Sequence, residues 1–72
     1  MTVSALLVAG PDDGRVVLLD DPTERVGVPH VFVVAAAEGT AEEKLLAMYR
    51  INIFRDKWTV EYTWEGWQTW ET

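Results

Sequence analysis

Hydrophobic and polar residues alternate most regularly near the end of the chain. Trp58, Val60, Tyr62 and Trp64 occupy every second position, and threonine or glutamate fills each gap. Successive side chains of a β-strand point to opposite faces, so the pattern predicts a strand with one aromatic and one polar face. This alternation favours a place in the core, rather than in an interface, for Trp58, Tyr62 and Trp64.

The last two tryptophans break this alternation. Trp67 and Trp70 follow Gly66 at a spacing of three, so we expect them to adopt a different conformation from the strand. The chain then forms one small β-rich domain, residues 1–72, in which residues 67–72 are a C-terminal aromatic extension. Exposed tryptophans are favoured anchors at protein interfaces, and we expect Trp67 and Trp70 to face outward.

Two hairpins are predicted at the two ends of the chain. Residues 3–9 and 15–19 are apolar runs, and residues 10–14, Gly-Pro-Asp-Asp-Gly, form a strong turn signal between them. Residues 49–54 alternate, and the polar turn at residues 55–57 leads into the tryptophan strand. Each pair of runs therefore predicts two adjacent antiparallel strands.

The middle of the chain is less regular. Val26 and Val28 alternate, and Pro29 after them is typical of a sheet edge, a strand start or a bulge. Residues 31–34 are β-branched or aromatic at every position, which predicts a strand that is covered on both faces, either by the chain itself or by a partner. Phe32 in this run is a third candidate for partner binding, beside Trp67 and Trp70.

Residues 35–46 allow two interpretations. Thr40 followed by Glu43 resembles a capping box, which favours a short helix at about 41–48. The alternative is a loop that runs directly into a strand. The whole pattern predicts a mainly β fold of about five strands in antiparallel order: a small antiparallel sheet, a half-open barrel or a sandwich, with one short helix near 41–48.

Composition narrows the classes of partner. The chain has 72 residues, no cysteine and one histidine, so large aromatic residues or self-association must supply stability that a small core lacks. The formal charge is −6 and the six basic residues are dispersed, which argues against nucleic-acid binding and suits a basic protein partner. The longest apolar run, residues 31–37, is too short to span a membrane.

No catalytic, cofactor or metal site is expected. His30 lacks partners for catalysis in the sequence, and we interpret it as a surface or strand-end residue. The pairs at 12–13 and 20–21 are interpreted as turn aspartates, and Glu61 and Glu65 as solvated strand residues.

Several short motifs resemble a known group of proteins. These are residues 9–15 (AGPDDGR), residues 26–29 (VGVP), Tyr49 and residues 62–66 (YTWEG). Together they resemble small proteins of actinobacterial tailed phages, whose pattern is Gly-Gly-Pro-x-Asp-Gly-Arg, a Val-Pro step, a tyrosine and a closing Tyr-x-Trp-x-Gly. The chain departs from that pattern at Ala9, and residues 67–72 lie outside it.

The resemblance implies a phage origin and a small β-rich fold, and no catalytic residues carry over from the group. A first hypothesis is a minor virion component that decorates or joins capsid or tail subunits, with self-association as a further contact. The alternative is an effector in the host cytoplasm that binds and inhibits a host or defence protein.

Overall fold

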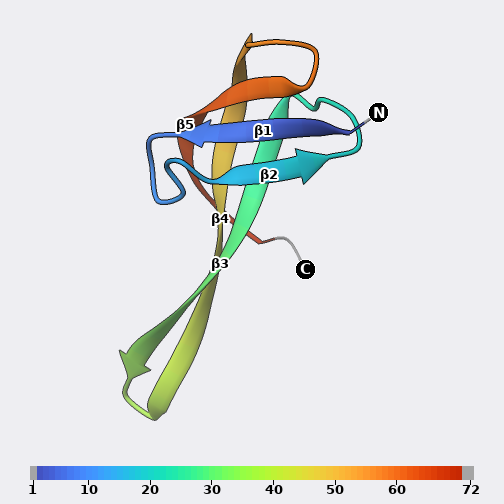
Figure 1. Cartoon of the computed structure of the whole chain (residues 1–72). Coiled ribbons are helices and arrows are strands. Elements are labelled where there is room, and N and C mark those ends of the chain that lie inside the picture. Colours follow the sequence, from blue (N-terminus) through green and yellow to red (C-terminus); the bar gives the residue numbers. More distant parts are fainter. Residues whose placement is uncertain (1, 71–72) are drawn as a thin grey trace.

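The computed structural model describes residues 2–70, with the side chains of all of these except Val34 and Ala36. Five strands form in this part of the chain: β1 (Val3–Val8), β2 (Val16–Leu19), β3 (Arg25–Ala36), β4 (Gly39–Phe54) and β5 (Thr59–Thr69). They make one mixed sheet in the order β2-β1-β5-β4-β3, curled into a half-barrel (Figure 1). The predicted mainly β, half-open barrel is confirmed.

The two predicted hairpins are present, but the sheet is not wholly antiparallel. β1 pairs with β2, and β4 pairs with β5, in antiparallel fashion. β1 also pairs in parallel with β5, from Ser4 opposite Thr59 to Val8 opposite Thr63. This contact joins the two ends of the chain, and the strands between them make the connection that a parallel pair requires.

The expected helix at 41–48 is wrong, because these residues belong to β4. β3 and β4 form a hairpin whose loop is Ala37 and Glu38, with Ala36 opposite Gly39. A helix of two turns is marginal without strong packing. The apolar run of β3 instead offers residues 39–44 a full set of ladder hydrogen bonds and cross-strand contacts.

The outer part of this hairpin, residues 31–44, is a two-stranded arm. β5 pairs with β4 only as far as Leu45, opposite Thr69, so no third strand reaches the arm. It projects away from the half-barrel (Figure 1). Val31, Phe32 and Val33 are exposed there, so the expected covering of both faces is not supplied by the chain itself.

β3 lies at one edge of the sheet. Pro29 lies within β3, opposite Leu46. Proline has no backbone N–H to donate, and on an edge strand this costs no hydrogen bond between strands inside the sheet. Of the three positions that Pro29 allows, an edge, a strand start or a bulge, the structure has the edge of the sheet.

The core lies on the concave face of the half-barrel. Its buried members are Ala5, Leu7, Val26, Val28, Ala47, Tyr49, Val60 and Tyr62, with Val17, Leu19, Ile51 and Trp64 packed against them. The hydroxyl of Tyr62 donates to the Thr23 carbonyl oxygen at 2.5 Å and accepts from the Thr23 N–H at 3.2 Å. Tyr62 therefore ties the β2–β3 loop to the centre of the sheet.

Trp58 departs from the predicted core position. It precedes β5 and is 55% exposed. The backbone N–H of Trp58 donates to the Asp56 carboxylate at 2.8 Å, so Trp58 belongs to the turn between β4 and β5 rather than to the strand. Tyr62 is fully buried and Trp64 is half-buried, as the alternation predicts.

A β-bulge explains the position of Trp67. Tyr49 lies opposite Trp64 and Met48 opposite Gly66, so Glu65 is an extra residue in β5. Residues directly opposite each other share a face, and Trp67, opposite Ala47, therefore returns to the concave face that Trp64 occupies. Contrary to the expectation of a different conformation, the strand continues through Trp67 to Thr69; residues 71–72 lie outside the described part of the chain.

Gly10 allows a close approach that a larger residue would prevent. Its φ is +68°, and a Cβ at this position would lie 2.5 Å from Cδ2 of Trp64. Gly14 has a φ of +83° but open space around it.

We expect Gly14→Ala to cost about 1 kcal/mol of unfolding free energy from backbone strain alone, and Gly10→Ala to cost about 3 kcal/mol because overpacking adds to that strain. Urea denaturation measures both, and equal losses would contradict the Gly10–Trp64 contact.

Candidate protein-binding surface

Four rings form a continuous aromatic patch on the concave side: His30, Phe32, Trp64 and Trp67. The Trp67 centroid lies 5.4 Å from that of Trp64, 5.4 Å from His30 and 5.5 Å from Phe32, in each case edge to face. His30 and Phe32 stack at 6.1 Å. Trp67 is 43% exposed and Phe32 is 39% exposed, so the patch presents apolar surface to solvent.

The patch brings together two of the three predicted partner-binding residues. His30 and Phe32 are two positions apart on β3, and so point to one face. The bulge at Glu65 turns Trp67 to the same face from β5. Phe32 and Trp67 therefore meet although they are far apart in the sequence.

Trp70, the third predicted residue, does not make these ring contacts. It is half-buried, and Nζ of Lys44 lies 5.6 Å from its ring centroid, in cation–π geometry. Its Nε1 is buried without a hydrogen-bond partner among the described residues. Trp67 and Trp70 thus have different surroundings, although sequence spacing placed them together.

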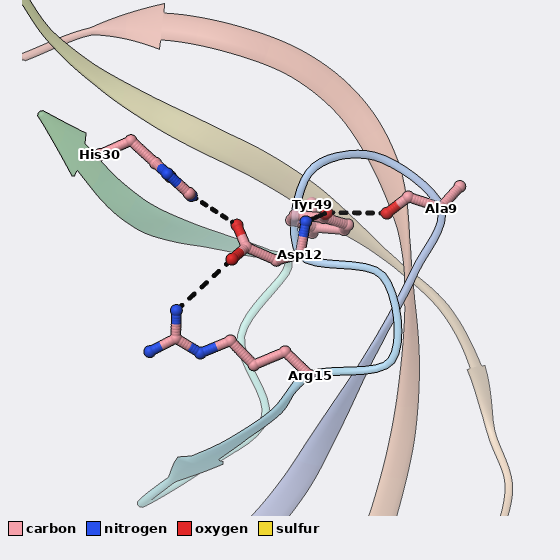
Figure 2. A network of polar contacts seen from close by, with 5 residues as sticks. All are labelled: Ala9, Asp12, Arg15, His30 and Tyr49. Carbon is pink, nitrogen blue, oxygen red and sulfur yellow. Dashed lines mark hydrogen bonds and ion pairs between the residues drawn. The ribbon is translucent and has the colours of Figure 1, made fainter. Parts of the chain in front are cut away.

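The buried side chain of Asp12 contacts His30 of the aromatic patch. Oδ2 of Asp12 lies 2.7 Å from Nε2 of His30, and Oδ1 lies 3.4 Å from a guanidinium nitrogen of Arg15 (Figure 2). The Asp12 side chain is only 7% exposed, whereas His30 is half-buried. A hydrogen bond to a buried carboxylate fixes the direction of the imidazole ring, and through it the neighbouring rings.

Tyr49 in turn holds Asp12. The Tyr49 hydroxyl donates to the carbonyl oxygen of Ala9 at 2.7 Å and accepts from the backbone N–H of Asp12 at 2.9 Å (Figure 2). The carboxylate of Asp13 accepts from the N–H of Ala9 at 2.7 Å. One hydroxyl on β4 therefore fixes both sides of the β1–β2 loop.

These contacts correct one interpretation and extend another. His30 is not a strand-end residue: it lies within β3 and contacts Asp12. Asp13 serves its turn, as predicted, but Asp12 does more, since it joins the loop to β3. The sequence contains no local signal for this contact, because 18 residues separate Asp12 from His30.

Glu61 and Glu65, which the sequence analysis interpreted as solvated strand residues, lie in ion pairs with arginines. Glu61 accepts from Nε of Arg55 at 2.8 Å, and Glu65 lies 3.2 Å from Arg25. Within residues 2–70 no three histidine or acidic residues gather as a metal site would require. The same part of the chain forms no pocket and contains no helix able to cross a membrane.

Comparison with protein-family models, with curated proteins and with solved structures finds no match to this chain. The patch and its support therefore carry the functional argument.

The two tyrosine hydroxyls allow a matched test of the loop contacts. Tyr49→Phe leaves the buried N–H of Asp12 without an acceptor, and we expect it to lower the unfolding free energy by about 2 kcal/mol. Tyr62→Phe removes the hydrogen-bond partner of the Thr23 N–H and carbonyl oxygen. Thr23 is exposed, so water can replace the hydroxyl, and the loss should be about 1 kcal/mol. Urea denaturation of both variants measures the difference. A smaller loss for Tyr49→Phe than for Tyr62→Phe would contradict the role given to Tyr49.

Because the Tyr49 hydroxyl is buried, we expect the unfolding free energy of the protein to fall at alkaline pH. Desolvation raises the pKa of the Tyr49 hydroxyl above its ordinary value of 10.0; the charges of Asp12 and Asp13 add to this rise, and the hydrogen bond with the Asp12 backbone opposes it. The unfolded chain then loses this proton first, so stability is complete below about pH 10 and falls as pH rises through the folded pKa. Wild-type protein should lose stability above pH 10 more steeply than Tyr49→Phe in parallel urea titrations. Identical slopes would show that Tyr49 does not contribute.

Proposed function

We propose that this protein is a non-enzymatic structural protein that binds another polypeptide through the aromatic patch and the adjoining arm. The observation that carries the proposal is the exposed contact of Phe32 with Trp67. Val31 and Val33, on the opposite face of β3, are exposed as well. Apolar surface of this kind is an unfavourable feature in a small monomer unless a partner covers it.

The patch has the properties of an interface anchor. Large rings bury much area for few rotatable bonds, and Trp67 is held by three neighbouring rings before any partner binds. A surface that is already ordered loses little conformational entropy on association. These features favour specific protein binding over a loose hydrophobic contact.

The finer proposal is a minor virion component of a tailed phage, which decorates or joins capsid or tail subunits. It is supported by the sequence resemblance and by the patch, whose expected partners are capsid or tail protein. The motif residues Gly10, Asp12, Tyr49 and Trp64 all belong to the packing of the β1–β2 loop. The motif pattern therefore supports the shared fold, and the experiments below test the virion role.

A second candidate function is an effector in the host cytoplasm that inhibits a host or defence protein. Its support is the acidic surface of the arm, where Glu38, Glu42 and Glu43 are exposed and suit a basic target. The two candidates predict different partners. Affinity capture from infected cells should recover capsid or tail protein for a virion component, and a stoichiometric host protein for an effector.

Co-sedimentation with purified phage particles tests the patch itself. We expect Phe32→Ala with Trp67→Ala to weaken binding by about 2 kcal/mol or more, because both anchors are removed. Trp70→Ala should have a smaller effect, since its ring is half-buried beside Lys44. Leu18→Ala, an exposed apolar residue on the opposite edge strand, is the matched control and should bind as wild type.

The urea midpoint of each variant shows whether the fold is intact. Unfolding of the Phe32/Trp67 variant would place these rings in the core rather than at an interface. Absence of the wild-type protein from particles, shown by mass spectrometry, would overturn the virion proposal.

A further inference from the structure

The outer edge of β3 carries backbone groups that no other strand of residues 2–70 pairs with, because β3 pairs only with β4. Just before β3 begins, the Glu24 carbonyl oxygen accepts from the N–H of Ile51 at 2.8 Å. Opposite residues of an antiparallel pair are alternately bonded and non-bonded, and the register of β3 with β4 is continuous. The even-numbered residues of β3 therefore bond to β4, and the odd-numbered residues direct their N–H and C=O groups outward.

Pro29 is one of these outward-facing residues, and it has no N–H to offer. Beyond it, Val31, Val33 and Ala35 each present an N–H and a C=O at the outer edge of the arm. The next odd-numbered residue, Ala37, already lies in the β3–β4 loop. Residues 31–35 therefore form a free edge, bounded by a proline on one side and by a loop on the other.

The free edge lacks the features that keep most edge strands from pairing. Residues 31–36, with the sequence VFVVAA, contain no charge, no proline and no glycine. Short β-branched segments of this composition pair readily with copies of themselves. The charges of the arm lie on β4 and in the loop, with Glu42 opposite Val33 and Lys44 opposite Val31. A strand added to the free edge would therefore be separated from the charges on β4 by β3 itself.

We infer that the free edge pairs with the free edge of a second copy, in antiparallel fashion, about a two-fold axis through Val33. Val33 then lies opposite Val33 of the second copy, and Val31 lies opposite Ala35. Each outward N–H between residues 31 and 35 gains a carbonyl acceptor, and each outward carbonyl gains a donor. The inference goes beyond the proposed function and does not rest on it.

Pro29 selects this register over its neighbours. A shift that placed Val31 opposite Val33 would also place Pro29 opposite Ala35, whose carbonyl oxygen would then face a residue without an N–H. The opposite shift would place Val31 against Ala37 of the loop, where β3 has ended. Only the register centred on Val33 uses every outward group of the free edge.

Side chains and charges are compatible with this pairing. Val31 is 52% exposed and Val33 is 69% exposed. Both would be covered in part, because directly opposite residues share a face. The backbones at the two Glu42 positions would lie three strand spacings apart, about 14 Å, whereas charges are screened over about 8 Å at physiological salt. Repulsion between the two acidic arms is therefore weak.

The pairing leaves the aromatic patch free. Phe32 and Trp67 lie on the face of β3 opposite to Val31 and Val33. The two-fold axis is perpendicular to the paired strands, so both patches lie on the same side of one continuous sheet. A dimer would thus present two patches to a surface with repeated sites, which increases avidity. Each free edge is used once, so association stops at a dimer.

Single cysteines test the register, because the natural chain has none. In Val33→Cys the two cysteine Cα atoms would lie about 5.5 Å apart, which permits a disulfide. Val31→Cys is the matched control on the same face, since its two Cα atoms would be about 13 Å apart. With oxidised glutathione, Val33→Cys should form a covalent dimer at least about tenfold faster than Val31→Cys. A mixture of Val31→Cys and Ala35→Cys should also cross-link, and equal rates for the two single variants would overturn the register.

A proline substitution tests the pairing without a covalent bond. Val33→Pro removes only an outward N–H, as Pro29 does, and leaves the bonds to β4 in place. The wild-type dimer should be detected by sedimentation velocity at about 1 mM. Val33→Pro should weaken it at least about tenfold, because two hydrogen bonds across the two-fold axis are lost. Circular dichroism shows that the variant is folded.

Trp67→Ala separates this inference from the proposed function. It should keep the dimer but weaken co-sedimentation with particles, because Trp67 lies on β5, away from the free edge. A wild-type chain that stays monomeric at about 1 mM would overturn the inference, as would a dimer that Val33→Pro does not weaken. Loss of co-sedimentation in Val33→Pro, with a monomeric wild type, would assign the free edge to a strand of the particle instead.

Discussion

The buried hydroxyl of Tyr49 is the contact on which the rest of this structure depends. It lies within the longest strand, β4, and binds both Ala9 and Asp12 of the β1–β2 loop. Asp12 then fixes His30, and His30 contacts Phe32 and Trp67. A single hydroxyl in the core is thereby connected, through one buried carboxylate, to the exposed aromatic patch. This arrangement lets a 72-residue chain without disulfides keep an ordered apolar surface.

Much of the fold could be predicted from local patterns. The turn at residues 10–14 predicted the first hairpin, and the alternation after Tyr49 predicted the second, because strand period and turn chemistry are local properties. Pro29 indicated an edge, a strand start or a bulge for the same reason, and the edge is what the structure has. The helix expected at 41–48 was wrong, since a capping signal in so short a segment is weaker than pairing with the apolar run of β3.

The candidate surface was predicted only in part, because its geometry depends on distant contacts. Phe32 and Trp67 were named as candidates, but their meeting follows from a bulge at Glu65 that shifts the register of β5. The Asp12–His30 contact and the parallel pairing of β1 with β5 join residues far apart in the chain. The alternation placed Trp58 in the core, although the strand begins one residue later, at Thr59.

Amide hydrogen exchange of the free protein, followed residue by residue by NMR, tests whether Tyr49 holds the β1–β2 loop. We expect the N–H of Asp12, which donates to the Tyr49 hydroxyl, to exchange only when the whole domain unfolds, at a rate close to that of the amides in the centre of β5. The exposed Glu38 amide at the end of the arm should exchange much faster. Exchange of the Asp12 amide as fast as that of Glu38 would show that the β1–β2 loop is not held by Tyr49, and would contradict an ordered support for the aromatic patch.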